Sequence, residues 1–99
     1  VNFTADWCIT CKVNEVVAID TEGTTDLFET LGVRYLKADW TLEDPKITAA
    51  LARFGRVGVP LYLVYHRGSE TPLLLPQILT GEMIRQALQT RAPAEINDA

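Results

Sequence analysis

Short apolar runs alternate with helical patterns of apolar and polar positions along the chain. Residues 1–5, VNFTA, are strand-forming, and a pattern with helical spacing follows over residues 8–19. After a break, a short helix is predicted over residues 25–31 with Gly32 as its stop signal, and residues 33–39, VRYLKAD, are predicted as a strand. The first part of the chain therefore predicts strand, helix, helix and strand.

The second part of the chain opens with a helix-start signal. Asp44 suits the cap of a helix, Pro45 suits its first position, and KITAALARF at 46–54 continues the helical pattern as far as Gly55. Because proline lacks the N–H that a helix start leaves unpaired, the Asp-Pro pair marks a start. We expect a third helix here.

A hairpin and a closing helix are predicted at the end of the chain. Residues 60–65, PLYLVY, and 72–76, PLLLP, flank the polar turn HRGSET, and a helix over 81–91 is capped by Thr80. Strands that alternate with helices in this order predict α/β architecture, with a mixed central sheet flanked by helices.

Length and composition fit one folded domain. The chain has 99 residues, of which 47% are apolar and 22% charged, so we expect a domain over residues 1–91 and a flexible tail over 92–99. The net charge of -4 comes without a basic cluster, which argues against nucleic acid as a partner. The longest apolar stretch, VGVPLYLVY, is too short for a membrane-spanning helix.

Because VNFT starts as a strand already in progress, we expect a piece of a longer protein with a truncated N-terminal strand.

The two cysteines of the chain stand three residues apart in TADWCITCK. At the start of a helix, the sulfur of Cys8 lies near unpaired N–H groups and the positive end of the helix dipole, which favour the thiolate. Cys11 follows one turn later on nearly the same face. This spacing supports a two-step exchange, in which Cys8 attacks a disulfide and Cys11 resolves the mixed disulfide.

Two other interpretations of the cysteine pair stay open. Half of a four-ligand zinc site has the same spacing, although the chain has no second cysteine pair and a single histidine, His66. Two buried, inert thiols also fit the pattern. Since a closed metal site would need carboxylates or another chain, the sequence favours the redox pair.

A helical wheel predicts that the helix over residues 8–19 is covered on most sides. Asn14 marks a narrow polar arc, and Glu15 projects between the directions of the two cysteines. We expect a raised pKa for Glu15, with its carboxylate moving the proton of Cys11, and the alternative is a solvated glutamate on a helix edge. One apolar arc of the wheel consists of Ile9, Val13, Val16 and Val17.

The two residues before Cys8 have candidate roles in the same chemistry. Asp6 is expected to cap the helix start and also to tune the pKa of the thiols. Trp7 is expected at the rim that a partner touches, and a position in the core is the alternative.

The combination of ADWCITCK after a strand and GVP at 58–60 before another strand resembles the thioredoxin superfamily, over essentially the whole chain. This resemblance implies a thioredoxin-like fold in which Pro60 is a cis-proline that faces the cysteines. It also implies that the backbone of Val59 binds the substrate as an added strand. The residues alone indicate that a proline is tolerated at the start of a strand and that a cis bond is uncommon.

Within this superfamily, ADWC, the lysine after the second cysteine and Glu15 look most like the C-terminal periplasmic domain of the transmembrane thiol:disulfide interchange protein DsbD and its copper-tolerance relatives. YLKADWT, GVPLYLVY and LPQILT add to this likeness. It implies that the domain passes electrons from a membrane-embedded donor to periplasmic partners, and that Asp6 and Glu15 adjust the thiol pKa values. Ile-Thr between the cysteines, in place of Gly-Pro, disfavours a general cytoplasmic thioredoxin.

Together, the residues and the resemblance predict a periplasmic thiol:disulfide oxidoreductase, specifically a protein-disulfide reductase, that needs no cofactor for the exchange and is monomeric. The spacing does not set the reduction potential, so an oxidase or isomerase is one alternative. A module that holds copper or zinc with the two thiols is another. The predicted partners are protein disulfides and a membrane-embedded electron donor. The predicted site consists of the catalytic Cys8 and Cys11, the pKa-tuning Asp6 and Glu15, and the substrate-binding Trp7, Val59 and Pro60.

Overall fold

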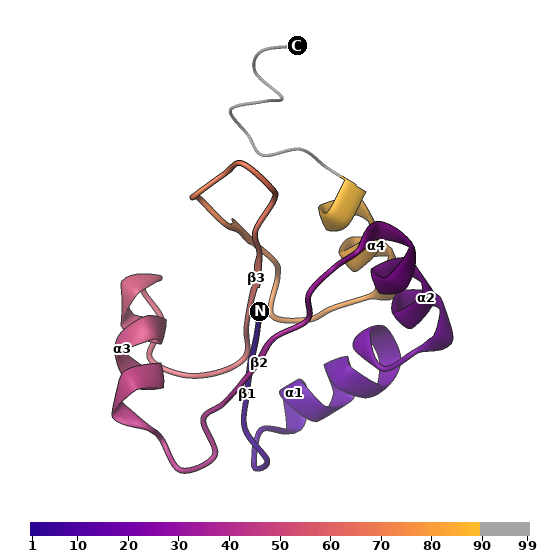
Figure 1. Ribbon diagram of the computed structural model, residues 1–99. Coiled ribbons are helices and arrows are strands. Elements are labelled where there is room, and N and C mark those ends of the chain that lie inside the picture. The colour runs from indigo at the N-terminus through magenta and orange to yellow at the C-terminus, as the bar shows by residue number, and fades with distance from the viewer. Residues whose placement is uncertain (90–99) are drawn as a thin grey trace.

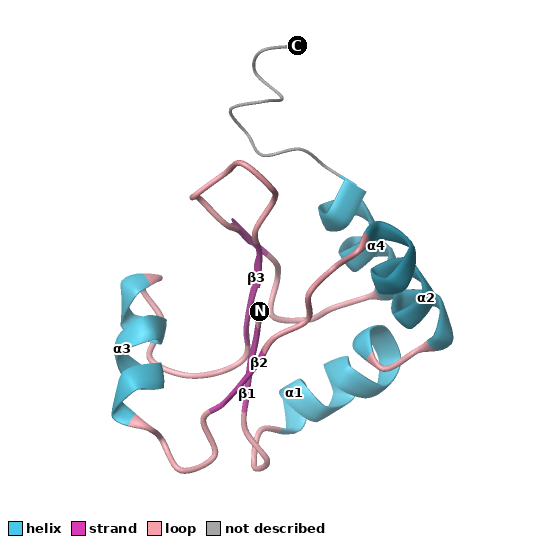
Figure 2. Cartoon of the chain, in the orientation of Figure 1, coloured by secondary structure: helices cyan, strands magenta, loops and turns pink. Residues whose placement is uncertain are grey.

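A four-stranded mixed sheet lies at the centre of the computed structural model, which describes residues 1–89 (Figures 1 and 2). The strand order is β2-β1-β3-β4, with β1 parallel to β2 and antiparallel to β3, and β3 antiparallel to β4. The predicted α/β fold with a mixed sheet is confirmed. The strands are β1 (Asn2–Thr4), β2 (Lys37–Asp39), β3 (Leu61–Val64) and β4 (Leu73–Leu74).

Helices cover both faces of this sheet. In Figure 1, α3 lies alone on one face, whereas α1, α2 and α4 lie together on the other. The helices are α1 (Ile9–Asn14), the one-turn π-helix η1 (Glu15–Ile19), α2 (Glu22–Leu31), α3 (Pro45–Arg53) and α4 (Gly81–Gln89). Because α1 follows directly after β1, the cysteines lie where the central parallel strand ends.

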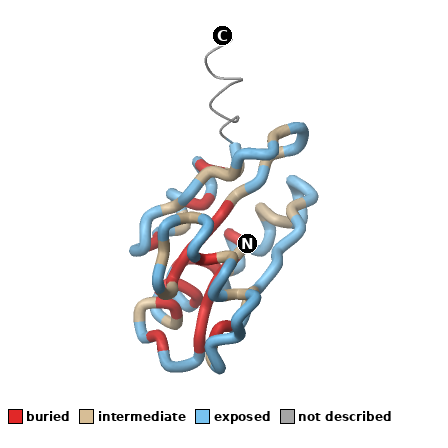
Figure 3. The backbone as a smooth tube through the Cα atoms, turned by 90° about the vertical axis from the view of Figure 1, so that its left-hand side faces the viewer, coloured by how far each residue is buried: buried red, intermediate tan, exposed pale blue. Residues whose placement is uncertain are grey.

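Alternating side chains of β3 contribute to a core on each face of the sheet. Leu61 and Leu63 pack on the α3 side, and Tyr62 packs on the side of η1 and α4. Figure 3 shows the buried segments gathered in the middle of the molecule. The two larger clusters of buried residues are Phe3, Trp40, Leu51, Leu61 and Leu63, and Ala18, Ile19, Tyr62, Leu79 and Ile84.

Local sequence signals set most of the helix ends. Gly32 ends α2 in the left-handed conformation at φ 67°, which glycine adopts without steric cost. The carboxylate of Asp44 accepts hydrogen bonds from the first N–H groups of α3, and Pro45 holds the first helical position. The hydroxyl of Thr80 accepts a bond from Met83 N at the start of α4. These four sequence signals are confirmed.

Two of the predicted elements have different bounds in the structure, and the end of a third lies outside the described residues. Helix α2 begins at Glu22, because the Thr21 side chain caps it by accepting from Thr24 N. The strand predicted over 33–39 is reduced to β2, since it pairs only where β1 runs beside it, from Asn2 opposite Lys37 onward. The last helix is described as far as Gln89, so its predicted end at Arg91 and the predicted tail over 92–99 lie outside the described residues.

The helix predicted over residues 8–19 is not covered as the wheel indicated. Its apolar arc faces solvent: Ile9 is 80% exposed and Val16 70%. Asn14, predicted on the polar arc, is instead buried. Its Nδ2 donates to Tyr62 Oη at 2.9 Å and to the Gln77 carbonyl at 2.7 Å, and its Oδ1 accepts from Leu79 N at 3.0 Å. The buried amide is stable here because both its Nδ2 and its Oδ1 have hydrogen-bond partners, two of which come from the buried residues Tyr62 and Leu79.

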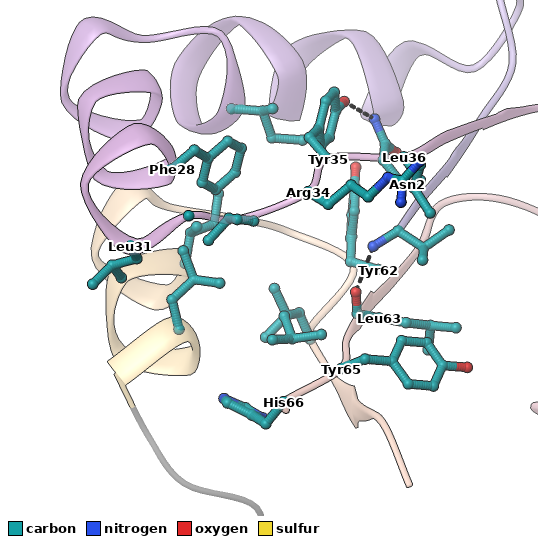
Figure 4. A pocket seen from close by; sticks show the side chains of 18 of the residues that line it. Asn2, Phe28, Leu31, Arg34, Tyr35, Leu36, Tyr62, Leu63, Tyr65 and His66 are labelled. Atoms are coloured by element: carbon teal, nitrogen blue, oxygen red, sulfur yellow. Dashed lines mark hydrogen bonds between the residues drawn. The ribbon is translucent and has the colours of Figure 1, made fainter. Parts of the chain in front are cut away.

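An apolar groove of about 720 Å³ lies at the end of β1 away from the cysteines (Figure 4). Val1 and Asn2 line it together with residues 31–36 and the end of β3. The amino group of Val1 donates to the Leu63 carbonyl at 2.6 Å, and Asn2 Nδ2 donates to Tyr35 Oη at 2.8 Å. Neither cysteine lines the groove. Among the described helices, none is long and apolar enough to cross a bilayer.

Candidate active site

The turn between β1 and α1 holds the cysteine pair, which forms a disulfide with the two Cα atoms 5.2 Å apart. Cys8 N donates to the Ala5 carbonyl at 3.1 Å, which closes the turn, and Cys8 is the N-cap residue of α1. Its Sγ accepts a bond of 3.1 Å from Cys11 N. One unpaired N–H of the helix start is thus aimed at the Cys8 sulfur, and it stabilises negative charge there when the pair is reduced.

The two cysteines differ in exposure. Cys8 is 8% exposed and Cys11 is fully buried. A partner therefore meets Cys8 before Cys11, an order that agrees with Cys8 as the attacking thiol and Cys11 as the resolving thiol.

The loop before β3 brings Val59 to the cysteines. Val59 packs against the small cluster of Ala5, Cys8 and Cys11, and its carbonyl oxygen lies 4.0 Å from Cys8 Sγ. The Val59–Pro60 peptide bond is cis, and Pro60 is buried. The fold thus joins two segments that are about fifty residues apart in sequence.

Glu15 is a buried carboxylate, with 5% of its surface exposed. Its Oε2 accepts from Thr4 Oγ1 at 2.7 Å and from Asn2 Nδ2 at 3.4 Å. Its Oε1 lies 3.6 Å from the ammonium groups of both Lys12 and Lys37. The carboxylate is thus held between polar side chains of β1 and two flanking cations.

The raised pKa predicted for Glu15 is wrong. Burial by itself raises the pKa of this carboxyl, but the hydrogen bonds from Thr4 and Asn2 and the charges of Lys37 and Lys12 outweigh burial and lower it. Glu15 is consequently ionised at neutral pH, and its role in moving the proton of Cys11 stays a prediction. The alternative of a solvated glutamate is wrong as well, because the side chain is buried.

Asp6 does not cap the helix. Cys8 occupies the cap position, and the exposed carboxylate of Asp6 lies 3.5 Å from Lys12 Nζ. Since Lys12 also lies near Glu15, one lysine links both predicted pKa-tuning residues. The effect of Asp6 on the thiols stays a prediction.

Trp7 is half exposed, so the alternative of a core position is wrong. Its Nε1 donates to the Thr41 carbonyl at 3.0 Å, and its ring centroid lies 5.7 Å from that of Trp40, at an interplanar angle of 56°. Trp7 therefore precedes Cys8 with its ring held by these two contacts and about half of its surface exposed. Its contact with a partner stays a prediction.

The side chains that hold these residues were not predicted from the sequence. Asn2 and Thr4 are polar residues at alternating positions of a strand, which places both on one face and is a usable signal for a buried polar partner. Thr41 gives no such signal, because the two site residues that it binds, Asp6 and Trp7, are more than thirty residues away in sequence. Among residues 1–89, no three His, Cys, Asp or Glu side chains lie together in a metal-binding arrangement.

Comparison with known proteins agrees with this fold. The model of a family described as thioredoxin-like matches residues 1–66, a range that includes both cysteines and Pro60. The reduced C-terminal domain of DsbD from Neisseria meningitidis is similar, with 21% identity, a TM-score of 0.70, and coverage of 89% of this chain and 75% of that one. Its oxidised form has 27% identity, a TM-score of 0.64, and coverage of 86% and 72%. A search of curated proteins gave no significant match.

Proposed function

The chain belongs to the thioredoxin-like family, and from that membership we propose that it acts as a protein-disulfide reductase and electron-relay domain. The observation that carries the proposal is the Cys8–Cys11 disulfide at the start of α1, with the Cys8 sulfur beside the Val59 carbonyl. The pair needs no further group to exchange electrons with a second disulfide. The fold of the DsbD C-terminal domain supports the same chemistry.

The exchange proceeds in two steps from the reduced pair. The Cys8 thiolate attacks one sulfur of a partner's disulfide; that S–S bond breaks, a mixed disulfide forms, and the second partner sulfur leaves as a thiolate that takes up a proton. Cys11 then gives up its proton and attacks Cys8 Sγ. The Cys8–Cys11 disulfide forms, the other partner sulfur leaves and is protonated, and two electrons and two protons have passed to the partner.

The substrate edge in this proposal lies around Cys8. The backbone of Val59 binds an extended segment of the partner as an added strand, and Trp7 and Pro60 border it. Main-chain hydrogen bonds of this kind give affinity without demanding one sequence. The position of the Val59 carbonyl next to the reactive sulfur supports this arrangement.

Asp6 and Glu15 tune the thiols in this proposal through their charge. A negative charge near a thiol disfavours the thiolate and raises the thiol pKa. Lys12, 3.5 Å from Asp6 and 3.6 Å from Glu15, offsets part of that effect. These three charges, together with Lys37 beside Glu15 and the helix N–H that points at the Cys8 sulfur, set how readily Cys8 ionises.

The electron source in this proposal is a membrane-embedded dithiol protein or domain, and the site of action is the periplasm. The support is the likeness to the DsbD C-terminal domain. The domain acts as a monomer between this donor and periplasmic protein disulfides. Each turnover requires that the donor reduce the Cys8–Cys11 disulfide again.

The test is the equilibrium reduction potential of the Cys8–Cys11 pair, measured in thiol-disulfide buffers with mass detection of both forms. A two-electron couple at about -200 mV or below is expected for a reductant, whereas a value near about -120 mV makes the protein an oxidase. If no reversible couple exists, the redox function is wrong. Titration of the reduced protein with Cu(I) and Zn²⁺ then tests the metal-binding alternative.

A further inference from the structure

The turn that carries Cys8 is held from outside by the loop that follows β2. Asp6 N donates to Thr41 Oγ1 at 2.8 Å, and Trp7 Nε1 donates to the Thr41 carbonyl at 3.0 Å. A single residue thus receives one bond from each of the two residues that precede Cys8. Both bonds span more than thirty positions of sequence, so they join two independent segments of the fold.

Asp39 fixes the orientation of Thr41. One oxygen of its carboxylate accepts from Thr41 N at 2.9 Å and also from the Thr41 hydroxyl. A threonine hydroxyl has one proton to donate. Because that proton is directed to Asp39, the oxygen is left to accept from Asp6 N. The bonds from Thr41 hold the pKa of Asp39 below its ordinary value, so the acceptor is ionised at neutral pH.

Only the short segment from Asp6 to Cys8 separates the Thr41 hydrogen bonds from the reactive sulfur. Cys8 N is bonded to the Ala5 carbonyl, and Cys8 Sγ accepts from Cys11 N. A displacement of Asp6 or Trp7 therefore moves the sulfur relative to the helix N–H that stabilises its thiolate. It also moves the sulfur relative to the Val59 carbonyl, 4.0 Å away.

We propose that Thr41, oriented by Asp39, is a positioning residue for thiol-disulfide exchange, because it fixes the Asp6–Trp7 turn and with it the Cys8 sulfur. The inference rests on the proposed function and adds two residues that act on the reaction through Cys8. Holding a reactive group in place before the partner arrives removes part of the entropic cost of reaching the reactive geometry. The half-exposed ring of Trp7 is oriented in advance by the same contact, which lowers the cost of ordering it in a complex.

Four variants of the reduced chain test this role. Thr41→Val removes the hydroxyl at nearly constant shape, and Asp39→Ala removes the acceptor that orients it. Thr41→Ser keeps the hydroxyl and removes only the methyl group. Thr25→Val makes the same change as Thr41→Val at an exposed position of α2 and is the matched control. Folding of each variant is checked by thermal unfolding, and all rates are measured well below the lowest unfolding temperature.

Two rates are measured for each variant: reduction of the protein disulfide probe insulin, and alkylation of the reduced Cys8 thiol by iodoacetamide. Thr41→Val and Asp39→Ala are expected to slow both by about 3- to 10-fold, since a small displacement of a reacting atom carries a large kinetic cost. Thr41→Ser is expected within about twofold of the wild type, as is Thr25→Val. A merely structural role predicts a lower unfolding temperature for Thr41→Val with both rates unchanged.

Alkylation needs no disulfide partner, so it separates this inference from the proposed function. If the wild type does not reduce insulin and shows no reversible couple, the proposed function fails. Slower alkylation in Thr41→Val, with recovery in Thr41→Ser, still supports the positioning of Cys8 in that case. Equal alkylation rates in the wild type, Thr41→Val and Asp39→Ala overturn the inference, whatever insulin shows.

Discussion

The hydroxyl of Thr4 donates a hydrogen bond of 2.7 Å to the buried carboxylate of Glu15. This bond joins β1, which leads into the cysteines, to the helical segment that follows them. It helps to lower the pKa of Glu15 despite burial, together with Asn2 and two lysines. The tertiary structure therefore keeps the Glu15 carboxylate ionised near the thiols. Because its pKa differs between the folded and unfolded states, its contribution to the free energy of unfolding depends on pH.

Replacement of Glu15 by glutamine is expected to lower the free energy of unfolding at pH 7 by about 1–2 kcal/mol. Because the folded pKa is depressed, the stabilisation by Glu15 is present above its unfolded pKa of about 4.3 and declines as the pH falls from there through the folded pKa. Urea unfolding of wild type and Glu15→Gln between pH 7 and pH 3 measures the difference. A difference that grows on acidification would contradict this assignment. Glu29→Gln, at an exposed position of α2, is the control.

Asn14 is expected to be the most sensitive polar residue of the first helix. Asn14→Leu removes the bonds to Tyr62 Oη, the Gln77 carbonyl and Leu79 N, and leaves those groups unpaired. Since buried groups without partners are costly, the loss is expected at about 2–4 kcal/mol in urea unfolding. Gln86→Leu, on the exposed side of α4, is expected to change stability by less than about 0.5 kcal/mol. Similar losses for both variants would show that Asn14 is not a buried junction.

The exposed apolar arc of the first helix predicts tolerance to polar residues. Val16→Gln is expected to change the free energy of unfolding by less than about 0.5 kcal/mol, because 70% of the Val16 side chain already faces solvent. Leu61→Ala, in the buried centre of β3, is expected to cost about 2–5 kcal/mol in the same assay. A loss above about 1 kcal/mol for Val16→Gln would instead support a covered helix.

The two cysteines are expected to differ when each is left alone. In reduced Cys11→Ser, Cys8 attacks glutathione disulfide, and the mixed disulfide accumulates because no second thiol resolves it. In Cys8→Ser, the remaining thiol of Cys11 is buried and is expected to react at least about tenfold more slowly. Mass spectrometry of the glutathione adduct over time measures both. Faster adduct formation in Cys8→Ser would reverse the assigned roles.

The sequence by itself determined the elements whose signals are local. Each of these signals acts within one turn of the helix end that it sets, so it can be predicted without knowing the fold. The residues are Asp44 with Pro45, Gly32 and Thr80. The cysteine spacing is local in the same sense: three residues place two thiols on one side of a helix start, within reach of each other.

Only the tertiary structure decided which faces are covered and which charges persist. The wheel assigned Asn14 to solvent and the valines to the core, and the fold reverses both, because Tyr62, Gln77 and Leu79 come from distant segments to pair with Asn14. The ionised state of Glu15 likewise depends on hydrogen bonds from β1 and on the charge of Lys37. The position of the turn before Cys8 depends on the hydrogen bond from Asp6 N to Thr41. Hydrogen-bond partners and neighbouring charges are properties of spatial proximity, whereas helix spacing describes a single segment.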